Sequence, residues 1–177
     1  MSEILLAGAS GLIGSNLIKK FKQKNHRIVL LSTQKNNCNG TDTLFWNPEK
    51  GIFPDIDLNR FSACYNFCGA GIFDENFTDK RKKILTESRI KPIEFLKENF
   101  SKQNVVIPSF ISASASGYYP NICLNELDED STSGTGFISE LVDAWEKAAH
   151  QFAPQATNLA IVRIGIVLSN KGGFLNK

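Results

Sequence analysis

The chain has 177 residues, of which 42% are hydrophobic and 21% charged, and its formal net charge is +2. This composition is that of an ordinary globular protein, long enough to form one domain with a hydrophobic core. The small net charge gives no reason to expect binding to nucleic acid or to a membrane. Because no apolar run approaches the length of a membrane span and the N-terminus lacks signal-peptide features, we expect a cytoplasmic protein.

Short apolar runs alternate with helical periodicity along the chain, which predicts βαβ units and a parallel sheet. In chain order, strands are expected at 4–7, 27–31, 43–46, 64–68, 109–112 and 159–164, and amphipathic helices at 11–22, 78–100 and 139–152. Pro92 either kinks the second helix or begins a second helical piece. Six strands with interleaved helices predict a doubly wound α/β fold with strand order 3-2-1-4-5-6 and helices on both faces.

The cysteines and histidines predict no metal site. The four cysteines are Cys38, Cys64, Cys68 and Cys123, and the two histidines are His26 and His150. None of them has the spacing of a common zinc motif, so free thiols in a reducing compartment are expected.

The first predicted strand ends in a glycine-rich segment, residues 8–14 with the sequence GASGLIG, which opens the first helix. In this position Gly8 allows a tight turn, Gly11 lets the backbone approach a diphosphate, and Gly14 lets the helix pack against the strand. Backbone N–H groups and the helix dipole then face the anion. We therefore expect NAD(P)(H) to bind here; a structural glycine turn without a ligand is the alternative.

The segment after the second strand bears on the choice of cofactor. It reads Ser32-Thr33-Gln34-Lys35 and contains no acidic residue. NAD-specific sites place Asp or Glu here to bind the ribose 2′-hydroxyl. An acid would repel the 2′-phosphate of NADP, whereas Ser32, Thr33 and Lys35 can bind it. The segment favours NADP(H), with NAD as the alternative cofactor, unless Lys35 is an ordinary solvated lysine.

Several segments together resemble the atypical extended short-chain dehydrogenase/reductase group, whose members are described as NAD-dependent epimerase/dehydratase-like or sugar-nucleotide epimerase family proteins. The segments are GASGLIG at 8–14, Ser88-Arg89, SASASGYYP at 112–120, Trp145-Glu146 and RIGIVL at 163–168. Members of the group continue into a smaller C-terminal half that binds substrate. The resemblance therefore implies that residues 1–177 are the NAD(P)-binding Rossmann domain, without the substrate domain.

The resemblance also implies which residues meet the cofactor. Gly8, Ser10, Gly11, Leu12, Ile13 and Gly14 would wrap the diphosphate, Ser32 and Thr33 would meet the adenosine ribose or its phosphate, and Phe67, Cys68, Gly69, Arg89, Ser112 and Val167 would line the rest. The group often has Arg at the position of Thr33 and Glu at that of Ala70. A helix-surface arginine is the alternative for Arg89.

Catalysis in active short-chain dehydrogenases needs a Ser or Thr, a Tyr and a Lys. Ser114 occupies the serine position, but Ile138 and Val142 fall near the tyrosine and lysine positions. Tyr118 and Tyr119 are the nearby candidates for the phenol, unless they pack over the cofactor.

Two functions therefore stay open. One is an NADP(H)-binding epimerase or oxidoreductase that acts on a small substrate such as a sugar nucleotide. The other is a non-catalytic dinucleotide-binding module or truncated remnant that lacks the Tyr–Lys pair. In either case a cofactor half on its own exposes apolar surface, which favours a homodimer.

Overall fold

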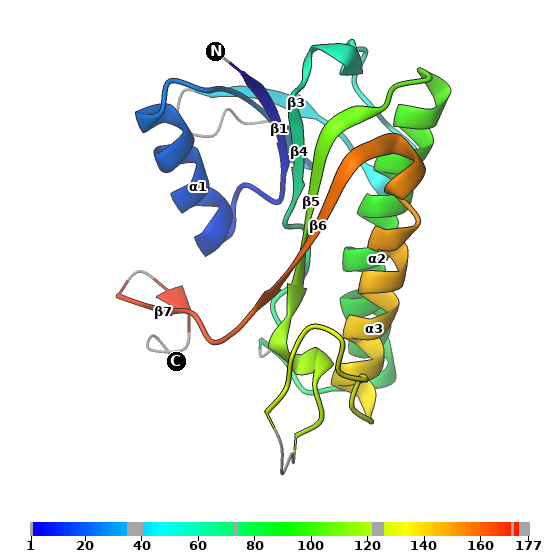
Figure 1. Ribbon diagram of the computed structural model, residues 1–177. Coiled ribbons are helices and arrows are strands. Elements are labelled where there is room, and N and C mark those ends of the chain that lie inside the picture. Colours follow the sequence, from blue (N-terminus) through cyan, green and yellow to red (C-terminus); the bar gives the residue numbers. More distant parts are fainter. Residues whose placement is uncertain (1, 35–40, 73, 122–125, 171, 174–177) are drawn as a thin grey trace.

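The computed structural model describes residues 2–34, 41–72, 74–121, 126–170 and 172–173, and its centre is a six-stranded parallel sheet (Figure 1). The strands are β1 (Glu3–Ala7), β2 (Arg27–Ser32), β3 (Asp42–Phe45), β4 (Ala63–Asn66), β5 (Ile107–Ala115) and β6 (Ala156–Ile164). They lie in the order β3-β2-β1-β4-β5-β6, and every neighbouring pair is parallel. The predicted strand order is therefore confirmed.

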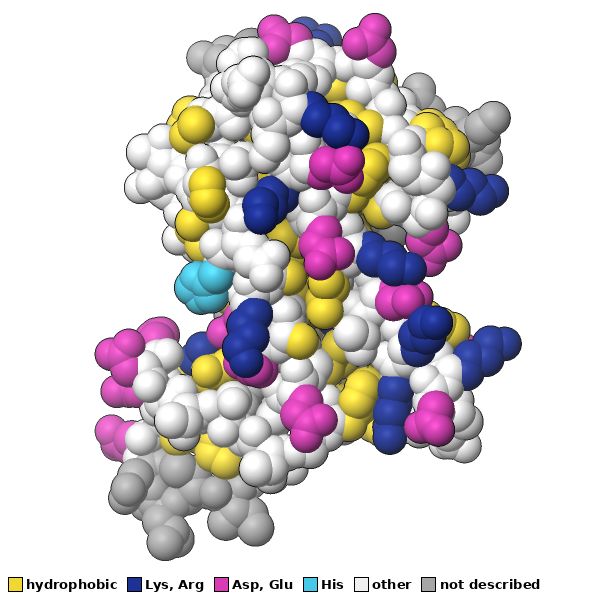
Figure 2. All heavy atoms as spheres, turned by 90° about the vertical axis from the view of Figure 1, so that its right-hand side faces the viewer, with side chains coloured by type: hydrophobic (Ala, Val, Ile, Leu, Met, Phe, Trp, Pro, Cys, Tyr) yellow, Lys and Arg dark blue, Asp and Glu magenta, His cyan; other side chains and the backbone are white. Residues whose placement is uncertain are grey.

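Helices cover both faces of the sheet, as predicted. Helix α1 (Leu12–Gln23) lies on one face, while α2 (Asp79–Lys102) and α3 (Phe137–His150) lie side by side on the other (Figure 1). Seen from the side of α2 and α3, positive and negative side chains are interspersed over the surface (Figure 2). Pairs four residues apart contribute to this pattern, such as Glu98 with Lys102 and Asp143 with Lys147.

Helix α2 runs through Pro92 without a break, so the second helical piece that the proline suggested does not form. Thr78 begins the helix, because its Oγ1 accepts a hydrogen bond from the Arg81 backbone nitrogen at 3.2 Å. Beyond the proline, Ile93, Leu96 and Phe100 are fully buried against the sheet. Burial of this apolar stripe outweighs the proline's preference for a helix start.

Strands β4, β5 and β6 depart most from their predicted bounds, and β6 begins at Ala156 rather than at residue 159. Strand β4 ends at Asn66 rather than Cys68, although the Phe67 backbone nitrogen still donates to the Ala7 carbonyl at 2.9 Å. Strand β5 is longer than the predicted 109–112 because it pairs with β6 from Ile107 to Ala115. The remaining elements are the short helices η1 (Pro48–Lys50), η2 (Leu58–Arg60), η3 (Ser116–Tyr118) and η4 (Ala153–Gln155), and the hairpin of β7 (Leu168–Ser169) and β8 (Gly172–Gly173).

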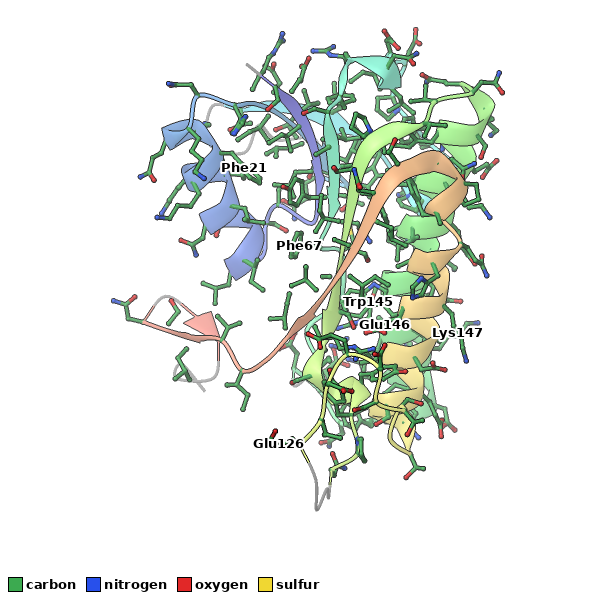
Figure 3. All side chains as sticks on the ribbon, in the orientation of Figure 1. Phe21, Phe67, Glu126, Trp145, Glu146 and Lys147 are labelled. Atoms are coloured by element: carbon green, nitrogen blue, oxygen red, sulfur yellow. The ribbon has the colours of Figure 1, made fainter. Side chains whose placement is uncertain are left out.

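The hydrophobic core has two parts, one on each face of the sheet. The larger lies between the sheet and helices α2 and α3, where the Phe110 and Phe152 rings stack with centroids 3.8 Å apart. The smaller lies under α1, and there Phe21 turns toward the sheet and contacts Tyr65 (Figure 3). None of the helices in the described ranges is both long and apolar enough to cross a membrane. Because all six strands run the same way, their carboxyl ends meet at one edge, where ligands of such sheets bind.

Candidate functional site

The glycine-rich turn after β1 requires glycine at two of its positions. Gly8 has a φ of +81°, and a Cβ there would lie 2.6 Å from the Cys68 backbone nitrogen and still closer to the Phe67 carbonyl. A Cβ at Gly14 would lie 2.5 Å from the Gly8 carbonyl oxygen. The turn therefore packs against β4 on one side and against its own helix on the other.

Gly11 plays a different part, because it faces open space. Among the described residues other than its two chain neighbours, the only heavy atom within 4 Å of a Cβ placed there is the Gly8 carbonyl oxygen, at 3.8 Å. Gly11 is also the N-cap of α1, so no side chain caps the helix, and its first turn contains no acidic residue. The backbone N–H groups at this helix start, with the positive end of the helix dipole, fit an anionic group such as a diphosphate.

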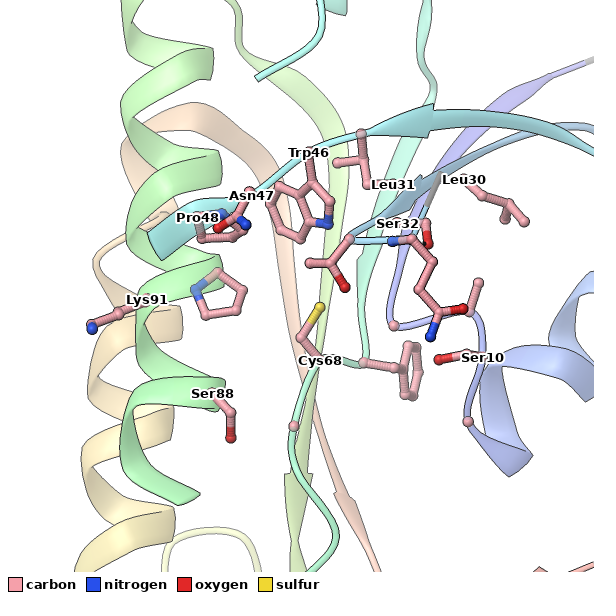
Figure 4. Close-up of a pocket in the computed structure, with 18 of the residues that line it drawn as sticks. Ser10, Leu30, Leu31, Ser32, Trp46, Asn47, Pro48, Cys68, Ser88 and Lys91 are labelled. Atoms are coloured by element: carbon pink, nitrogen blue, oxygen red, sulfur yellow. Dashed lines mark hydrogen bonds between the residues drawn. The ribbon is translucent and has the colours of Figure 1, made fainter. Parts of the chain in front are cut away.

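A cavity of about 500 Å³ lies beside this turn, within the size range of small-molecule sites (Figure 4). It extends from the glycine turn past the end of β2 to the turn that follows β3, and α2 forms one wall. The lining residues are Gly8–Gly11, 30–34, Trp46–Glu49, Phe67–Gly69, Glu87, Ser88, Lys91 and Pro92. Figure 4 shows Ser10 and Ser32 at one end of the cavity, with Trp46, Pro48 and α2 at the other.

The structure brings many of the predicted cofactor residues together in this cavity. Those that line it are Gly8, Ser10, Gly11, Ser32, Thr33, Phe67, Cys68 and Gly69. Leu12, Ile13 and Gly14 form the first turn of α1 directly beyond it. Arg89, Ser112 and Val167 do not line it, and Lys35 lies outside the described residues. The Trp46–Glu49 turn and the α2 wall also line the cavity and were not predicted from the sequence.

The end of the cavity beside β2 is polar but carries no acid. The Ser32 Oγ accepts a hydrogen bond from the Gln34 backbone nitrogen at 3.1 Å, which fixes the chain just beyond the strand. Ser10 and Thr33 add two further hydroxyl-bearing residues to the lining. The two acids that line the cavity come from other segments, and Glu87 is paired with Lys91 at 3.2 Å.

The two cysteines of the described chain are free thiols, as predicted. Cys68 lines the cavity, and burial raises the pKa of its thiol to about 12. Burial also raises the pKa of Cys64, which lies in β4 beneath it. Both side chains are therefore protonated at neutral pH, and Cys68 offers the cavity a neutral wall.

Arg89 lies under the cavity floor rather than on the surface of α2. Its guanidinium donates to the carbonyls of Ala70 and Leu85, each at 3.0 Å, and sits 5.1 Å from the Trp145 ring centroid. A Cβ at Gly69 would lie 3.2 Å from the Arg89 Cζ. Burial, and then the nearby charge of Arg81, lower the pKa of Arg89 to about 10. Arg89 thus holds the segment after β4 in place from below, and the helix-surface alternative is wrong.

Ser114 lies at the opposite part of the sheet edge, in a buried network. Its Oγ donates a hydrogen bond to the Glu146 carboxylate on α3, and only 2% of the Ser114 surface is exposed. The same carboxylate accepts two hydrogen bonds from Arg163 on β6, at 2.8 and 2.9 Å. Figure 3 shows Glu146 and Trp145 directed from α3 toward the sheet, while Lys147 points away.

The two tyrosines that follow β5 contact Arg163. The Arg163 Nη1 donates to the Tyr119 hydroxyl at 2.9 Å, and its Cζ lies 3.8 Å from the Tyr118 ring centroid. Arg163 therefore joins β6, α3 and η3 through one guanidinium. Tyr118 and Tyr119 are packed against an arginine, and the cavity beside the glycine turn is lined by other residues.

The side chains at the positions of the missing Tyr–Lys pair lie just beyond the carboxyl end of β5. A Cβ at Gly117 would lie 2.7 Å from the Ile138 Cγ2 and 3.9 Å from the Val142 Cγ2. Apolar side chains, of which Val142 is fully buried, therefore lie at the two positions where the resemblance predicts a tyrosine and a lysine. Within the described residues, no three His, Cys, Asp or Glu side chains gather as metal ligands would.

The sheet order, the glycine turn and the cavity at the strand ends define a Rossmann-type nucleotide-binding fold. The sequence matches the NAD dependent epimerase/dehydratase family over residues 4–135, and the chain belongs to this family.

Relatives and solved structures agree with this assignment. An epimerase family protein of Mycobacterium bovis is 34% identical over 174 residues, 98% of this chain and 56% of that protein. The nucleoside-diphosphate sugar epimerase of Corynebacterium glutamicum is 30% identical with a TM-score of 0.77, over 99% of this chain and 36% of that one. Human epimerase family protein SDR39U1, solved with NADPH, has a TM-score of 0.81 at 24% identity. This match covers 98% of this chain and 57% of the human chain. The chain thus spans about half the length of the curated relatives it matches.

Proposed function

We propose that the chain binds NADP(H) in the cavity beside the glycine turn, as the cofactor-binding half of an epimerase or oxidoreductase of the extended short-chain dehydrogenase type. One observation carries the proposal: the start of α1, uncapped by any side chain at Gly11, opens beside a cavity of about 500 Å³. A diphosphate supplies the acceptors that these backbone donors lack. The NADPH in the structure of the human protein SDR39U1 supports the same class of cofactor.

The preference for NADP(H) over NAD(H) follows from the end of β2. Asp or Glu at this position would hold the ribose 2′-hydroxyl of NAD and repel a 2′-phosphate. The cavity has Ser32 and Thr33 there instead, and Ser10 lies at the same end as Ser32 (Figure 4). Hydroxyl groups can donate hydrogen bonds to phosphate oxygens without adding negative charge.

The substrate of the proposed enzyme is a small molecule, and relatives named as sugar-nucleotide epimerases make that class the first to test. Ser114 at the end of β5 is the group that would polarise a substrate carbonyl, with Tyr118 or Tyr119 as the source of a proton. When NADP(H) is bound it supplies hydride transfer. In this chain the Ser114 Oγ already donates to Glu146, so it must exchange that partner to act on a substrate.

A non-catalytic dinucleotide-binding module is the second candidate, and specific contacts favour it. Ile138 and Val142 are apolar at the positions of the Tyr–Lys pair, and the Tyr119 hydroxyl is engaged by Arg163. If the chain turns over a carbonyl or sugar-nucleotide substrate and Ser114→Ala abolishes this turnover, the first candidate, an enzyme, is supported. The absence of turnover, with dinucleotide binding intact, supports the module.

The binding experiment is a fluorescence titration with NADPH and with NADH. We expect saturable binding of both, tighter for NADPH. The control is Gly11→Asp, whose carboxylate can cap α1 and occupy the place of the diphosphate. This variant should fold at least as stably as the wild type and lose binding of both nucleotides. No saturable signal from either nucleotide with the wild-type chain refutes the proposal.

A further inference from the structure

The wall that α2 contributes to the cavity contains a helix turn that lacks one backbone hydrogen bond. The four lining residues are Glu87, Ser88, Lys91 and Pro92, which form two pairs four residues apart and therefore one face of the helix. Pro92 lies inside a continuous helix of 24 residues. The single position where the hydrogen-bond ladder of α2 must be broken thus coincides with the wall of the dinucleotide cavity.

The proline changes what this wall offers to a ligand. In a regular helix the Ser88 carbonyl oxygen would accept a hydrogen bond from the backbone nitrogen of residue 92. Proline has no N–H, and its ring pushes this carbonyl away from the helix axis. Since Ser88 and Pro92 both line the cavity, the displaced acceptor lies on the cavity side of α2.

The polar side chains of this wall already have partners, because Glu87 is paired with Lys91 at 3.2 Å and the Ser88 Oγ is hydrogen-bonded. The Ser88 carbonyl is the group of this wall that Pro92 leaves without its helical donor. The Ser88 Oγ donates to the Leu85 carbonyl at 3.1 Å and accepts from the Ala70 backbone nitrogen at 3.0 Å. On the opposite wall, the Asn47 Oδ1 accepts from the Lys50 backbone nitrogen at 3.1 Å.

The position of this carbonyl indicates which part of the cofactor it meets. The diphosphate belongs at the glycine turn and the adenosine ribose beside the end of β2. The base then occupies the far end of the cavity, between α2 and the turn that contains Trp46 and Pro48 (Figure 4). Trp46, Pro48 and Pro92 give this end flat apolar walls, which suit a purine ring. A carbonyl among them can accept a hydrogen bond from a donor on that ring.

We propose that the Ser88 carbonyl, released by Pro92, accepts a hydrogen bond from the exocyclic amino group of adenine and makes the cavity select adenine over hypoxanthine. Adenine carries a donor at its C6 position, whereas hypoxanthine carries an oxygen there, which would face another acceptor. This inference rests on the proposed function, because it requires the dinucleotide to lie in this cavity.

The test compares the affinity of the wild-type chain for NADPH and for its hypoxanthine analogue, measured by equilibrium fluorescence titration. We expect NADPH to bind about tenfold more tightly, which corresponds to about 1.4 kcal/mol, the order of one hydrogen bond lost and an acceptor left unpaired. Pro92→Ala restores the backbone donor to the Ser88 carbonyl. In that variant the affinity ratio should fall toward one, while circular dichroism still shows the helical content.

Pro108→Ala provides the matched control, since Pro108 also lies inside a regular element but does not line the cavity. It should keep the wild-type affinity ratio. Equal affinity of the wild type for the two nucleotides overturns the inference and leaves the proposed function intact. Full discrimination retained by folded Pro92→Ala also overturns it. If neither nucleotide binds, the proposed function and the inference both fail.

Discussion

The carboxyl edge of the sheet differs between its two parts. At the ends of β1, β2 and β4, glycines, hydroxyl side chains, Gln34 and Phe67 line a cavity of about 500 Å³. At the ends of β5 and β6 it consists of a serine, a carboxylate, a guanidinium and two phenol groups that bind one another. The first part has donors and space for a ligand. In the second, the groups suited to catalysis are already partners of each other.

Binding and catalysis therefore place separate demands on the carboxyl edge of one sheet. An anion would stabilise the start of α1, because the backbone N–H donors there have no side-chain cap. The Ser114–Glu146–Arg163 network is complete without a ligand, so a substrate must replace one of its bonds. Binding of a dinucleotide is therefore the firmer expectation, and turnover depends on whether Ser114 can leave Glu146.

The largest effect is expected at the open part of the edge, from Gly8→Ala. A methyl group there would strike the backbone of Phe67 and Cys68, and the φ of +81° is itself unfavourable for alanine. We expect the free energy of unfolding to fall by more than about 3 kcal/mol, as urea denaturation would measure.

Gly11→Ala is the matched control for this change. A Cβ at Gly11 has its nearest neighbour at 3.8 Å, and the residue has a φ of −72°, which alanine adopts freely. Its stability should stay within about 0.5 kcal/mol of the wild type, while NADPH binds more weakly because the methyl group keeps the diphosphate away. Equal destabilisation by the two substitutions would remove the distinction between a packed and an open glycine.

The second largest effect is expected in the closed network, from Glu146→Ala. The change leaves the mostly buried Arg163 guanidinium and the buried Ser114 hydroxyl without their common acceptor. We expect a loss of about 2 to 3 kcal/mol of unfolding free energy by urea denaturation, between the values for exposed and fully buried pairs. Asp143→Ala breaks the exposed pair with Lys147 on the same helix and should cost less than about 0.5 kcal/mol. A similar loss of unfolding free energy in the two variants would mean that the network stabilises the fold no more than an exposed ion pair does.

The fold and the glycine turn could be predicted because their signals are local. Short apolar runs predict the buried strands, and the spacing of Gly8, Gly11 and Gly14 predicts the tight backbone turn at the start of the first helix. The predicted bounds of a strand were wrong where pairing with a neighbouring strand determines where it ends. Strand β4 stops at Asn66 although the apolar run continues to Cys68, because its neighbour β1 ends at Ala7.

The missed parts of the site depend on contacts between distant segments. The cavity joins the Trp46–Glu49 turn to the wall formed by residues 87–92, more than 35 positions away, and neither segment carries a motif for that contact. Glu146 and Arg163 stood out only as parts of a resemblance. Their bonds to Ser114 and Tyr119 follow from the alignment of β5, β6 and α3, which no short pattern encodes.

A smaller effect, on selectivity alone, is expected from Thr33→Asp in the open part of the edge. A carboxylate beside the end of β2 repels the 2′-phosphate and can accept from a 2′-hydroxyl. The ratio of NADPH to NADH affinity should fall by about tenfold, or about 1.4 kcal/mol, in parallel fluorescence titrations. Thr33→Asn has nearly the same shape without the charge and should keep a ratio close to the wild type. If Asp and Asn change the ratio equally, the 2′-phosphate does not lie beside this residue.

The smallest effect is expected from pH, acting on the closed network. Burial alone would raise the pKa of the Glu146 carboxyl, but hydrogen bonds from Arg163 and Ser114 outweigh it and hold the pKa below its ordinary value. The unfolded chain therefore binds the proton first as pH falls. The stabilisation from the ionised carboxylate is present above the unfolded pKa of about 4.3 and is lost as pH falls through the lower folded pKa.

This pH effect can be separated from general acid unfolding with Glu146→Gln, which keeps the shape and one acceptor but does not titrate. Urea denaturation between pH 6 and pH 3 should show a steeper loss of unfolding free energy for the wild type than for the variant. Equal slopes would show that Glu146 has the same pKa in the folded and unfolded chains. The Arg163 pairing would then contribute no charge-dependent stability, and the two parts of the sheet edge would differ only in shape.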